Sequence, residues 1–333
     1  MDRNSIDLGW TDEQWSRVLK TVGDEANRAR VAAAFLPLFG PVDATVQGVA
    51  NLKLGYQQDP DGDRQRLFVD SEPNTLLATI AVQVALCSHE AQDPELNAAL
   101  GMFRRAANVI ARVEDALLFH GQADRGAPPA AGVENLPPIF RVTGGRAQAG
   151  LLSAPTRIPV VVPAPVNPDP DLATRLLSAQ RGDAIVNSVV QAINQLESHG
   201  HVGPFACVLG HDLFATACAP SVGLILPRDR ILPFLEGPLL RSSSVPPDHG
   251  FVIGLGGNPI ELVVGSDISV RLLQMTPEPR FLFRVSERVA LRAREWSAVA
   301  VLDPKATSVR SHAAPWNPPA APAHKPTDAA TPR

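Results

Sequence analysis

The residues of this chain that could do chemistry are a few histidines and one short polar stretch that begins at Cys87. His199, His201 and His211 offer imidazole nitrogens, which suit zinc or copper, but no nearby cysteine or carboxylate completes a ligand set. Cys87 to Glu90 (Cys-Ser-His-Glu) places a nucleophile beside a base, yet sequence neighbours rarely meet as a catalytic triad does. We therefore expect neither a metal site nor a catalytic constellation.

A glycine-rich run, Gly254 to Asn258 (Gly-Leu-Gly-Gly-Asn), superficially suggests a dinucleotide-binding loop. Such a loop lies between a strand and a helix, whereas Pro259 and a β-type run follow here, so we expect a tight hairpin. A soluble enzyme such as an esterase would need a nucleophile elbow or paired site residues, which the sequence lacks. The chain is expected not to be an enzyme and to need no cofactor.

Composition sets the outer bounds of the function. With 333 residues the chain can bury a sizeable core in two or three lobes. A net charge of −4 with scattered lysine and arginine gives no electrostatic footprint for nucleic acid. Cys87, Cys207 and Cys218 lie in apolar stretches and are expected to be buried free thiols. Without a signal sequence or a spanning segment, we expect a cytoplasmic protein that binds neither nucleic acid nor membrane.

Two helices and a hairpin are predicted in the first 120 residues. Thr11 and Gln14 have capping-box spacing before an amphipathic helix that should end before Pro37. The turn-rich stretch Asn51–Asp70 predicts a two-stranded arm, which has no face buried by its own chain and needs a neighbour to cover it. A strand over 75–86 and a long helix ending at Gly121 should follow.

The rest of the chain is predicted to be loop-rich and then β-rich. Residues 122–172 are dominated by proline, glycine and alanine, with one strand candidate at 158–162. The expected elements after that are a helix over 183–198, a strand over 205–209, short helices over 211–217 and 228–235, and three or four strands up to about residue 302. Residues 303–333 hold seven prolines and few large apolar groups, so we expect a disordered tail.

Four short motifs then occur in an informative order. They are Glu114-Asp115 with Phe119-x-Gly121, Gly203-Pro204-Phe205, Gly256-Gly257 with Glu261-Leu262 and Asp267-Ile268-Ser269, and Phe283-Arg284-Val285. Together they resemble the encapsulin shell proteins, also called linocin-like bacteriocins, which share the phage capsid fold of the HK97 type. The resemblance implies an α+β fold with an N-terminal helix, an extended loop, a peripheral domain built on a long spine helix, and an axial domain.

The resemblance also divides the chain. It implies a helical arm and the start of the peripheral domain at 1–50, with its helix over 11–34, and an extended loop at 51–74. The peripheral domain would continue over 75–182, with a spine helix over 94–120 and a proline-rich insertion. The axial domain would span 183–271, strands at 272–302 would return to the peripheral domain, and 303–333 would be a tail.

The function implied is that of a shell subunit. Identical copies would assemble into an icosahedral nanocompartment that encloses a cargo protein carrying a C-terminal loading peptide. The alternative is a viral or prophage major capsid protein of the same fold. The chain has no excess of positive charge, which favours the compartment, because the inner surface of a genome container must neutralise phosphate.

Three sets of site residues follow from the resemblance. Phe35, Leu38 and Phe39, within Phe35–Pro41, would contact the cargo peptide, or else simply pack in the core. The pore-loop candidates, which could equally form an ordinary surface loop, are Pro220, Ser221, Val222, Gly223, Leu224 and Ile225. The intersubunit arm would use Gln57, Asp59, Asp61, Gly62 and Arg64, around the turn-rich tip at 59–63.

Overall fold

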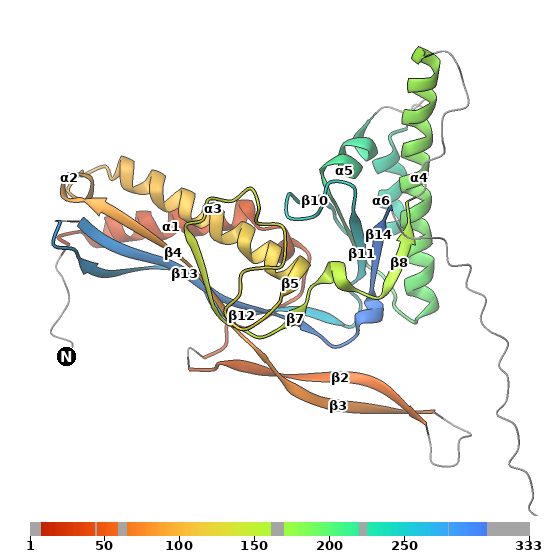
Figure 1. Cartoon of the computed structure of the whole chain (residues 1–333), viewed down its shortest axis with the longest axis horizontal. Coiled ribbons are helices and arrows are strands. Elements are labelled where there is room, and N and C mark those ends of the chain that lie inside the picture. The colour runs from red at the N-terminus through yellow and green to blue at the C-terminus, as the bar shows by residue number, and fades with distance from the viewer. Residues whose placement is uncertain are drawn as a thin grey trace, which may run out of the picture.

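The computed structural model describes residues 8–43, 45–58, 65–160, 170–219, 225–278 and 280–304. Figure 1 shows an elongated lobe with two helices above a long sheet, a second lobe at one end of it, and a hairpin below the long sheet. Each lobe has its own five-stranded sheet. The larger apolar core cluster extends from the helices and the long sheet to one side of the second sheet, and a smaller cluster lies on the other side of that second sheet. The observed α+β architecture agrees with the predicted fold class.

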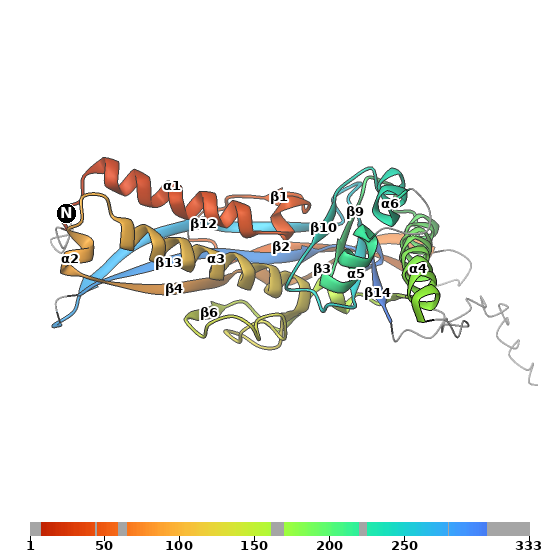
Figure 2. The ribbon, with the colours of Figure 1, turned by 90° about the horizontal axis from the view of Figure 1, so that it is seen from above.

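The long sheet has the strand order β1-β12-β13-β4-β6. Its strands are β1 (Leu38–Phe39), β4 (Ala78–Cys87), β6 (Phe140–Gly144), β12 (Ile260–Met275) and β13 (Arg280–Ala293). All neighbours are antiparallel except β1, which lies parallel to β12 at the sheet edge. Helices α1 (Asp12–Ala29) and α3 (Asn97–His120) pack against each other and against this sheet (Figure 2).

Helix α3 forms the spine of this lobe, as predicted. Its apolar residues recur every three or four positions, and from Ala106 to Phe119 almost every residue is buried. Gly121 ends the helix at φ 79°, where a Cβ would lie 2.1 Å from the carbonyl oxygen of Gln148, so only glycine fits. The helix begins at Asn97, three residues later than predicted.

Helix α1 begins as predicted but ends early. Thr11 and Gln14 form the capping box, and the apolar stripe packs on α3 and β12, although Leu19 is exposed. The helix ends at Ala29 instead of continuing to residue 34, and a short 3-10 turn, η1 (Ala32–Ala34), follows. The side-chain carboxylate of Asp115, on α3, accepts hydrogen bonds from the backbone amides that follow the end of α1.

The second lobe has the strand order β10-β9-β11-β14-β8. The strands are β8 (Thr156–Pro159), β9 (Phe205–Leu209), β10 (Leu239–Arg241), β11 (Gly250–Gly254) and β14 (Val299–Asp303). Both β9 and β11 are buried along their whole length. Helices α4 (Pro170–Ser198), α5 (His211–Cys218) and α6 (Pro227–Leu235) pack in this lobe (Figure 1).

The two sheets divide the chain differently from the predicted boundaries. The expected axial segment 183–271 is split, because β12 enters the long sheet at Ile260. The expected return segment 272–302 is split as well, because β14 joins the second sheet. Gly254–Asn258 is therefore not a hairpin: it connects β11 to β12, which lie in different sheets. Turn residues show where a strand ends but not which strand it will pair with.

The proline-rich stretch contains more structure than predicted. In place of one strand at 158–162 it holds β5 (Gly121–Gln122), β6, β7 (Gln148–Ala149), the turn η2 (Leu151–Ser153) and β8. Helix α4 starts at Pro170 rather than residue 183, with proline in the first turn, where the missing N–H costs nothing. Two further short elements are α2 (Ser88–Ala91) and η3 (Trp296–Ala298). Among the described helices, none combines the length and apolarity needed to cross a bilayer.

Candidate functional site

The hairpin below the long sheet is formed by β2 (Gly48–Gln58) and β3 (Gln65–Leu76), which in the described part of the chain pair only with each other. Its base is fixed to the body by Arg288 on β13, whose Nη2 donates to Val46 O. Leu77 N–H donates to Gln47 O at 2.9 Å, which extends the β2–β3 ladder by one more pair at the base. Val49 packs into a small cluster with Leu77 and Val263. The hairpin is thus anchored at one end and extends away from the long sheet (Figure 1).

Beyond the base, the hairpin exposes apolar side chains. Leu52 is 48% exposed and Val69 is 53% exposed. Leu52 pairs with Ser71, two residues from Val69, so both side chains lie on one face of the hairpin. The sequence predicted this two-stranded arm. Of its named residues Gln57 lies in β2, whereas Asp59, Asp61, Gly62 and Arg64 lie outside the described residues.

The predicted cargo-contact residues separate into buried and exposed side chains. Phe35 is only 7% exposed and packs its ring 6.1 Å from that of Phe251. It belongs to the main core cluster, so its assignment as a peptide contact is wrong. Leu38 is 62% exposed and Phe39 is 38% exposed, both on the edge strand β1. Residues three or four positions apart in an irregular segment need not share a face.

Strand β1 is held against the sheet by its neighbours. Leu262 N donates to Pro37 O at 2.9 Å and Val42 N donates to Val264 O at 3.0 Å. A Cβ on Gly40, at φ 123°, would lie 2.4 Å from Val264 O, so the Gly-Pro pair that follows β1 requires glycine for close backbone approach. The backbone of β1 is therefore fixed on the side that faces β12, while the Leu38 side chain is exposed.

The Phe39 ring packs on an arginine that is itself held by a buried ion pair. The Arg292 guanidinium carbon lies 3.9 Å from the centre of the Phe39 ring, a cation–π contact. Arg292 Nε in turn donates to Glu261 Oε2 at 2.7 Å, and Arg294 Nη2 reaches the same oxygen at 3.0 Å. Both Glu261 and Arg292 are buried. Glu261 belongs to one of the family motifs, but no local pattern in the sequence indicates its two arginine partners.

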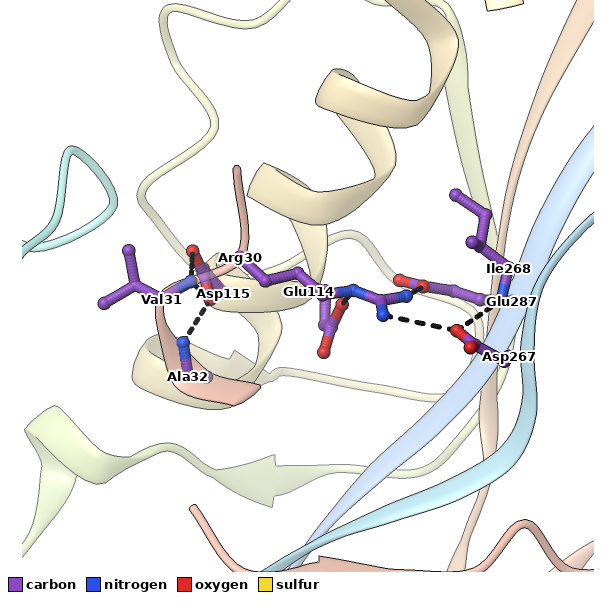
Figure 3. A network of polar contacts seen from close by, with 8 residues as sticks. All are labelled: Arg30, Val31, Ala32, Glu114, Asp115, Asp267, Ile268 and Glu287. Carbon is purple, nitrogen blue, oxygen red and sulfur yellow. Dashed lines mark hydrogen bonds and ion pairs between the residues drawn. The ribbon is translucent and has the colours of Figure 1, made fainter. Parts of the chain in front are cut away.

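A second buried ionic cluster lies where α1 ends, and Figure 3 shows its members. Arg30 contacts three carboxylates from three different elements: Nε lies 2.6 Å from Glu114 Oε2, Nη1 lies 3.2 Å from Asp267 Oδ1, and Nη2 pairs with Glu287. The Arg30–Glu114 contact is an ion pair whose atoms are not aligned for a hydrogen bond. One guanidinium thus links α1 to α3, β12 and β13.

Charge is unbalanced in this cluster, because one arginine faces several carboxyl groups. Burial raises the pKa of Glu114 well above its ordinary value, and the nearby charge of Glu287 raises it further. Burial also raises the pKa of Glu287, against the attraction of Arg30. Burial would lower the pKa of Arg30, but Glu287 and Glu114 outweigh it and keep the guanidinium charged. Both carboxyl groups therefore bind a proton more readily in the folded chain than in water.

Asp115 explains why α1 stops at Ala29. Its Oδ1 accepts from Ala32 N–H at 2.8 Å, and its carboxylate accepts from Val31 N–H at 3.0 Å (Figure 3). Burial raises the pKa of Asp115 to about 7, although these two backbone donors oppose the shift. The carboxylate satisfies the amide groups at the start of η1, which have no partner within that turn. Glu114 and Asp115, recognised only as a family motif, thus lock the turn that leads to β1.

The remaining sequence candidates lie apart from these features. Of the predicted pore loop, only Ile225 is described, and it is 60% exposed. Glu90 accepts from Cys87 N at 2.8 Å, which makes the Cys-Ser-His-Glu stretch a helix cap. Cys207 is a buried free thiol whose pKa is raised by burial, while Cys87 and Cys218 are free and half-buried. Within the described ranges, no three His, Cys, Asp or Glu side chains gather as metal ligands.

Comparison with known proteins gives a family match in the second half of the chain. Residues 170–290 match the Linocin_M18 family, described as an encapsulating protein for peroxidase. The type 1 encapsulin shell protein EncA of Myxococcus xanthus (strain DK1622) is 23% identical over 307 residues, which cover 88% of this chain and 93% of that protein. The matched family segment runs from α4 into β13 and so includes both sheets.

Solved structures show the same fold. A virus-like particle from Pyrococcus furiosus matches with a TM-score of 0.57 and 14% identity, covering 87% of this chain and 100% of that chain. The capsid of Myoviridae phage XM1 matches with a TM-score of 0.52 and 12% identity, covering 80% and 88%. The chain therefore has the HK97-type capsid fold.

Within that fold, residues 170–290 resemble an encapsulating-protein family, and the curated relative that is similar over most of the chain is an encapsulin shell protein. This confirms the resemblance inferred from the sequence motifs. The two features that such a protein needs beyond its fold are surfaces for its neighbours and a surface for its contents. The arm and the exposed part of β1 are the candidates for these two roles.

Proposed function

We propose that identical copies of this chain close into an icosahedral compartment in the bacterial cytoplasm. The observation that carries this proposal is the arm β2–β3, which exposes Leu52 and Val69 on one face and whose strands pair with no other described strand. An isolated two-stranded hairpin is marginal in water, so it gains stability when a neighbouring copy covers it. Repeating one such contact with rotational symmetry closes a shell.

We further propose that the compartment holds protein rather than a genome. The HK97-type fold also forms phage capsids, so the fold alone does not separate the two functions. The net charge of −4 and the match to an encapsulating-protein family both favour protein contents. The ratio of absorbance at 260 nm to that at 280 nm in purified shells tests this choice, because packaged nucleic acid would raise it.

Leu38 and Phe39 are the proposed contacts for the loading peptide of the cargo. Leu38 is exposed on an edge strand, and Phe39 is half-exposed over Arg292. An apolar edge of this kind suits an extended peptide, which can combine main-chain hydrogen bonds with side-chain burial. The exposed Ile225 similarly supports a role for 220–225 in lining an opening between copies.

The peptide proposal is tested by placing a charge at Leu38. Leu38→Asp should leave folding intact, since the side chain is exposed, but it should lose most of the cargo that wild-type shells carry when purified from the native host. Met275→Asp, at the far end of the same sheet and 47% exposed, is the matched control and should retain its cargo. Quantitative mass spectrometry of the shell contents provides the measurement.

The possible outcomes separate the alternatives. Equal cargo in wild-type and Leu38→Asp shells would move the peptide groove elsewhere. Loss of cargo in both variants would mean that any added charge impairs loading. Insoluble Leu38→Asp protein would contradict the exposure of this side chain.

A further inference from the structure

A cavity of about 620 Å³ lies at the junction of the two lobes, away from the arm and from β1. It is lined by the end of α3, the loop before β6, the start of α5 and the loop after β10. Its volume is within the range of small-molecule sites. Neither the assembly of a shell nor the binding of a cargo peptide calls for such a cavity.

One arginine, two histidines and three serines converge on this cavity. Arg241, His211 and His120 line it, together with the consecutive serines 242–244. The Arg241 guanidinium carbon lies 5.9 Å from the centre of the Phe214 ring, which orients its planar group. Among the described residues, neither Arg241 nor His211 has a carboxylate partner. These donors are therefore free to meet an anion.

Other polar groups around the cavity are already engaged. His120 Nε2 lies 2.6 Å from Ser244 O; since a carbonyl can only accept, this nitrogen carries a proton. Ser244 Oγ donates to Arg112 O, while Ser242 Oγ accepts from Ser244 N. The hydroxyl hydrogens of Ser242 and Ser243 remain available as donors. The first backbone amides of α5 are not available, because Asp212 N and Leu213 N both donate to Pro247 O.

One carboxylate, that of Glu134, opposes the positive charge of Arg241 in the cavity. Glu134 lines it, and its Oε1 accepts from Gly132 N–H at 3.1 Å. Backbone hydrogen bonds lower the pKa of Glu134, so the group is ionised at neutral pH. An anion in the cavity would meet the attraction of Arg241 and the repulsion of Glu134. Variants of these two residues should therefore change affinity in opposite directions.

We propose that this cavity binds a small molecule through a phosphate group. Arg241 would donate two parallel N–H groups to the phosphate oxygens, as a guanidinium fork does to tetrahedral and planar oxyanions. His211 and the hydroxyls of Ser242 and Ser243 would supply further donors. This inference is independent of the proposed compartment function, since it uses none of the arm or β1 residues.

Isothermal titration of the purified full-length protein with inorganic phosphate and pyrophosphate tests the proposal. Wild type should show saturable binding, and Arg241→Ala should weaken it about 10- to 100-fold, the usual loss when a charge-assisted hydrogen bond is removed. Glu134→Gln should strengthen binding severalfold. Arg271→Ala removes an exposed arginine outside the cavity and should leave the affinity unchanged.

Three results would overturn the proposal. The first is the absence of saturable phosphate binding by the wild-type protein. The second is an unchanged affinity in both Arg241→Ala and His211→Ala. The third is equal affinity for acetate and phosphate, which would show general charge attraction in place of phosphate recognition. Electron microscopy of each variant checks that its assembly matches wild type.

Discussion

The ionic cluster at the end of α1 and the arm β2–β3 are opposite kinds of structure. In the cluster, Arg30 joins four elements of one chain, and each of its carboxylate partners comes from that same chain. In the arm, the strands pair with each other, and apolar side chains such as Leu52 and Val69 remain exposed. The first region is completed by its own chain. The second is completed by another copy, under the proposed function.

This contrast separates folding from assembly. A substitution in the cluster should change the stability of each subunit, whereas a substitution on the outer arm should change association and leave the subunit folded. The two effects can be measured independently on the same protein.

The arm should be indispensable for the shell. Leu52→Asp combined with Val69→Asp places two charges on its apolar face, so desolvating them against a neighbour would be costly. We expect no shells by size exclusion and electron microscopy, but soluble subunits or small oligomers with native circular dichroism. Deleting residues 57–65 should have the same result.

The matched control for the arm keeps its apolar face. Leu52→Met combined with Val69→Ile should still form shells, because both changes conserve burial on contact. Complete shells from the double aspartate variant would show that the arm is not an intersubunit contact.

Arg30 should dominate the stability of the subunit. Arg30→Ala leaves Glu114 and Glu287 buried without their cation, and breaking a buried pair in this way costs about 3–5 kcal/mol. Chemical denaturation at equal protein concentration measures the loss. Lys20→Ala removes an exposed cation of α1 whose partner, Asp24, is also exposed, and should have little effect. Similar midpoints for the two variants would refute the role of the cluster.

The elements of this fold that the sequence predicts are those specified by residues close together in the chain. The cap of α1, the periodicity of α3 and the arm between β2 and β3 each depend on residues close in sequence. The end of α1 depends on Asp115, 84 residues from Val31, so no local pattern could indicate it. The same holds for β12 and β14, which enter different sheets through long-range pairing.

The candidate site was predictable in outline only. The segment Phe35–Pro41 is apolar enough to suggest a binding edge, but its sequence does not show that Phe35 points into the core and Leu38 outward. That difference arises from the irregular turn after α1 and the parallel pairing of β1 with β12. Arg292, which supports Phe39, is 253 residues away in the sequence.

The buried carboxyl groups should make stability depend on pH. Burial raises the pKa of Asp115 to about 7 and that of Glu114 well above its ordinary value, whereas in the unfolded chain such groups titrate near 4. The folded state therefore retains these protons when the unfolded state has lost them. Their contribution to stability is full below about pH 4 and falls as pH rises toward the folded pKa values.

A neutral replacement isolates this effect. Glu114→Gln keeps the shape of the protonated side chain, so the fall in unfolding free energy between about pH 4 and pH 7 should be shallower than in wild type. Glu13→Gln, in the exposed first turn of α1, should leave the slope unchanged. A steeper slope in Glu114→Gln would mean that Glu114 is ionised in the folded subunit.

The C-terminal tail should matter least. Residues 304–333 are rich in proline and poor in large apolar groups, so their composition offers little surface for packing. Their removal should leave both shell formation and the thermal midpoint nearly unchanged, as measured by size exclusion and calorimetry. A loss of shells would instead identify the tail as a structural clamp.

Cryo-electron microscopy of the purified wild-type protein, expressed without a cargo protein, tests the central claim most directly. We predict closed icosahedral shells of uniform size in which each arm lies against a neighbouring copy, with no density for packaged nucleic acid. Folded monomers or small open oligomers at micromolar concentration would contradict the account, because the arm would then be stable without a neighbour to cover it.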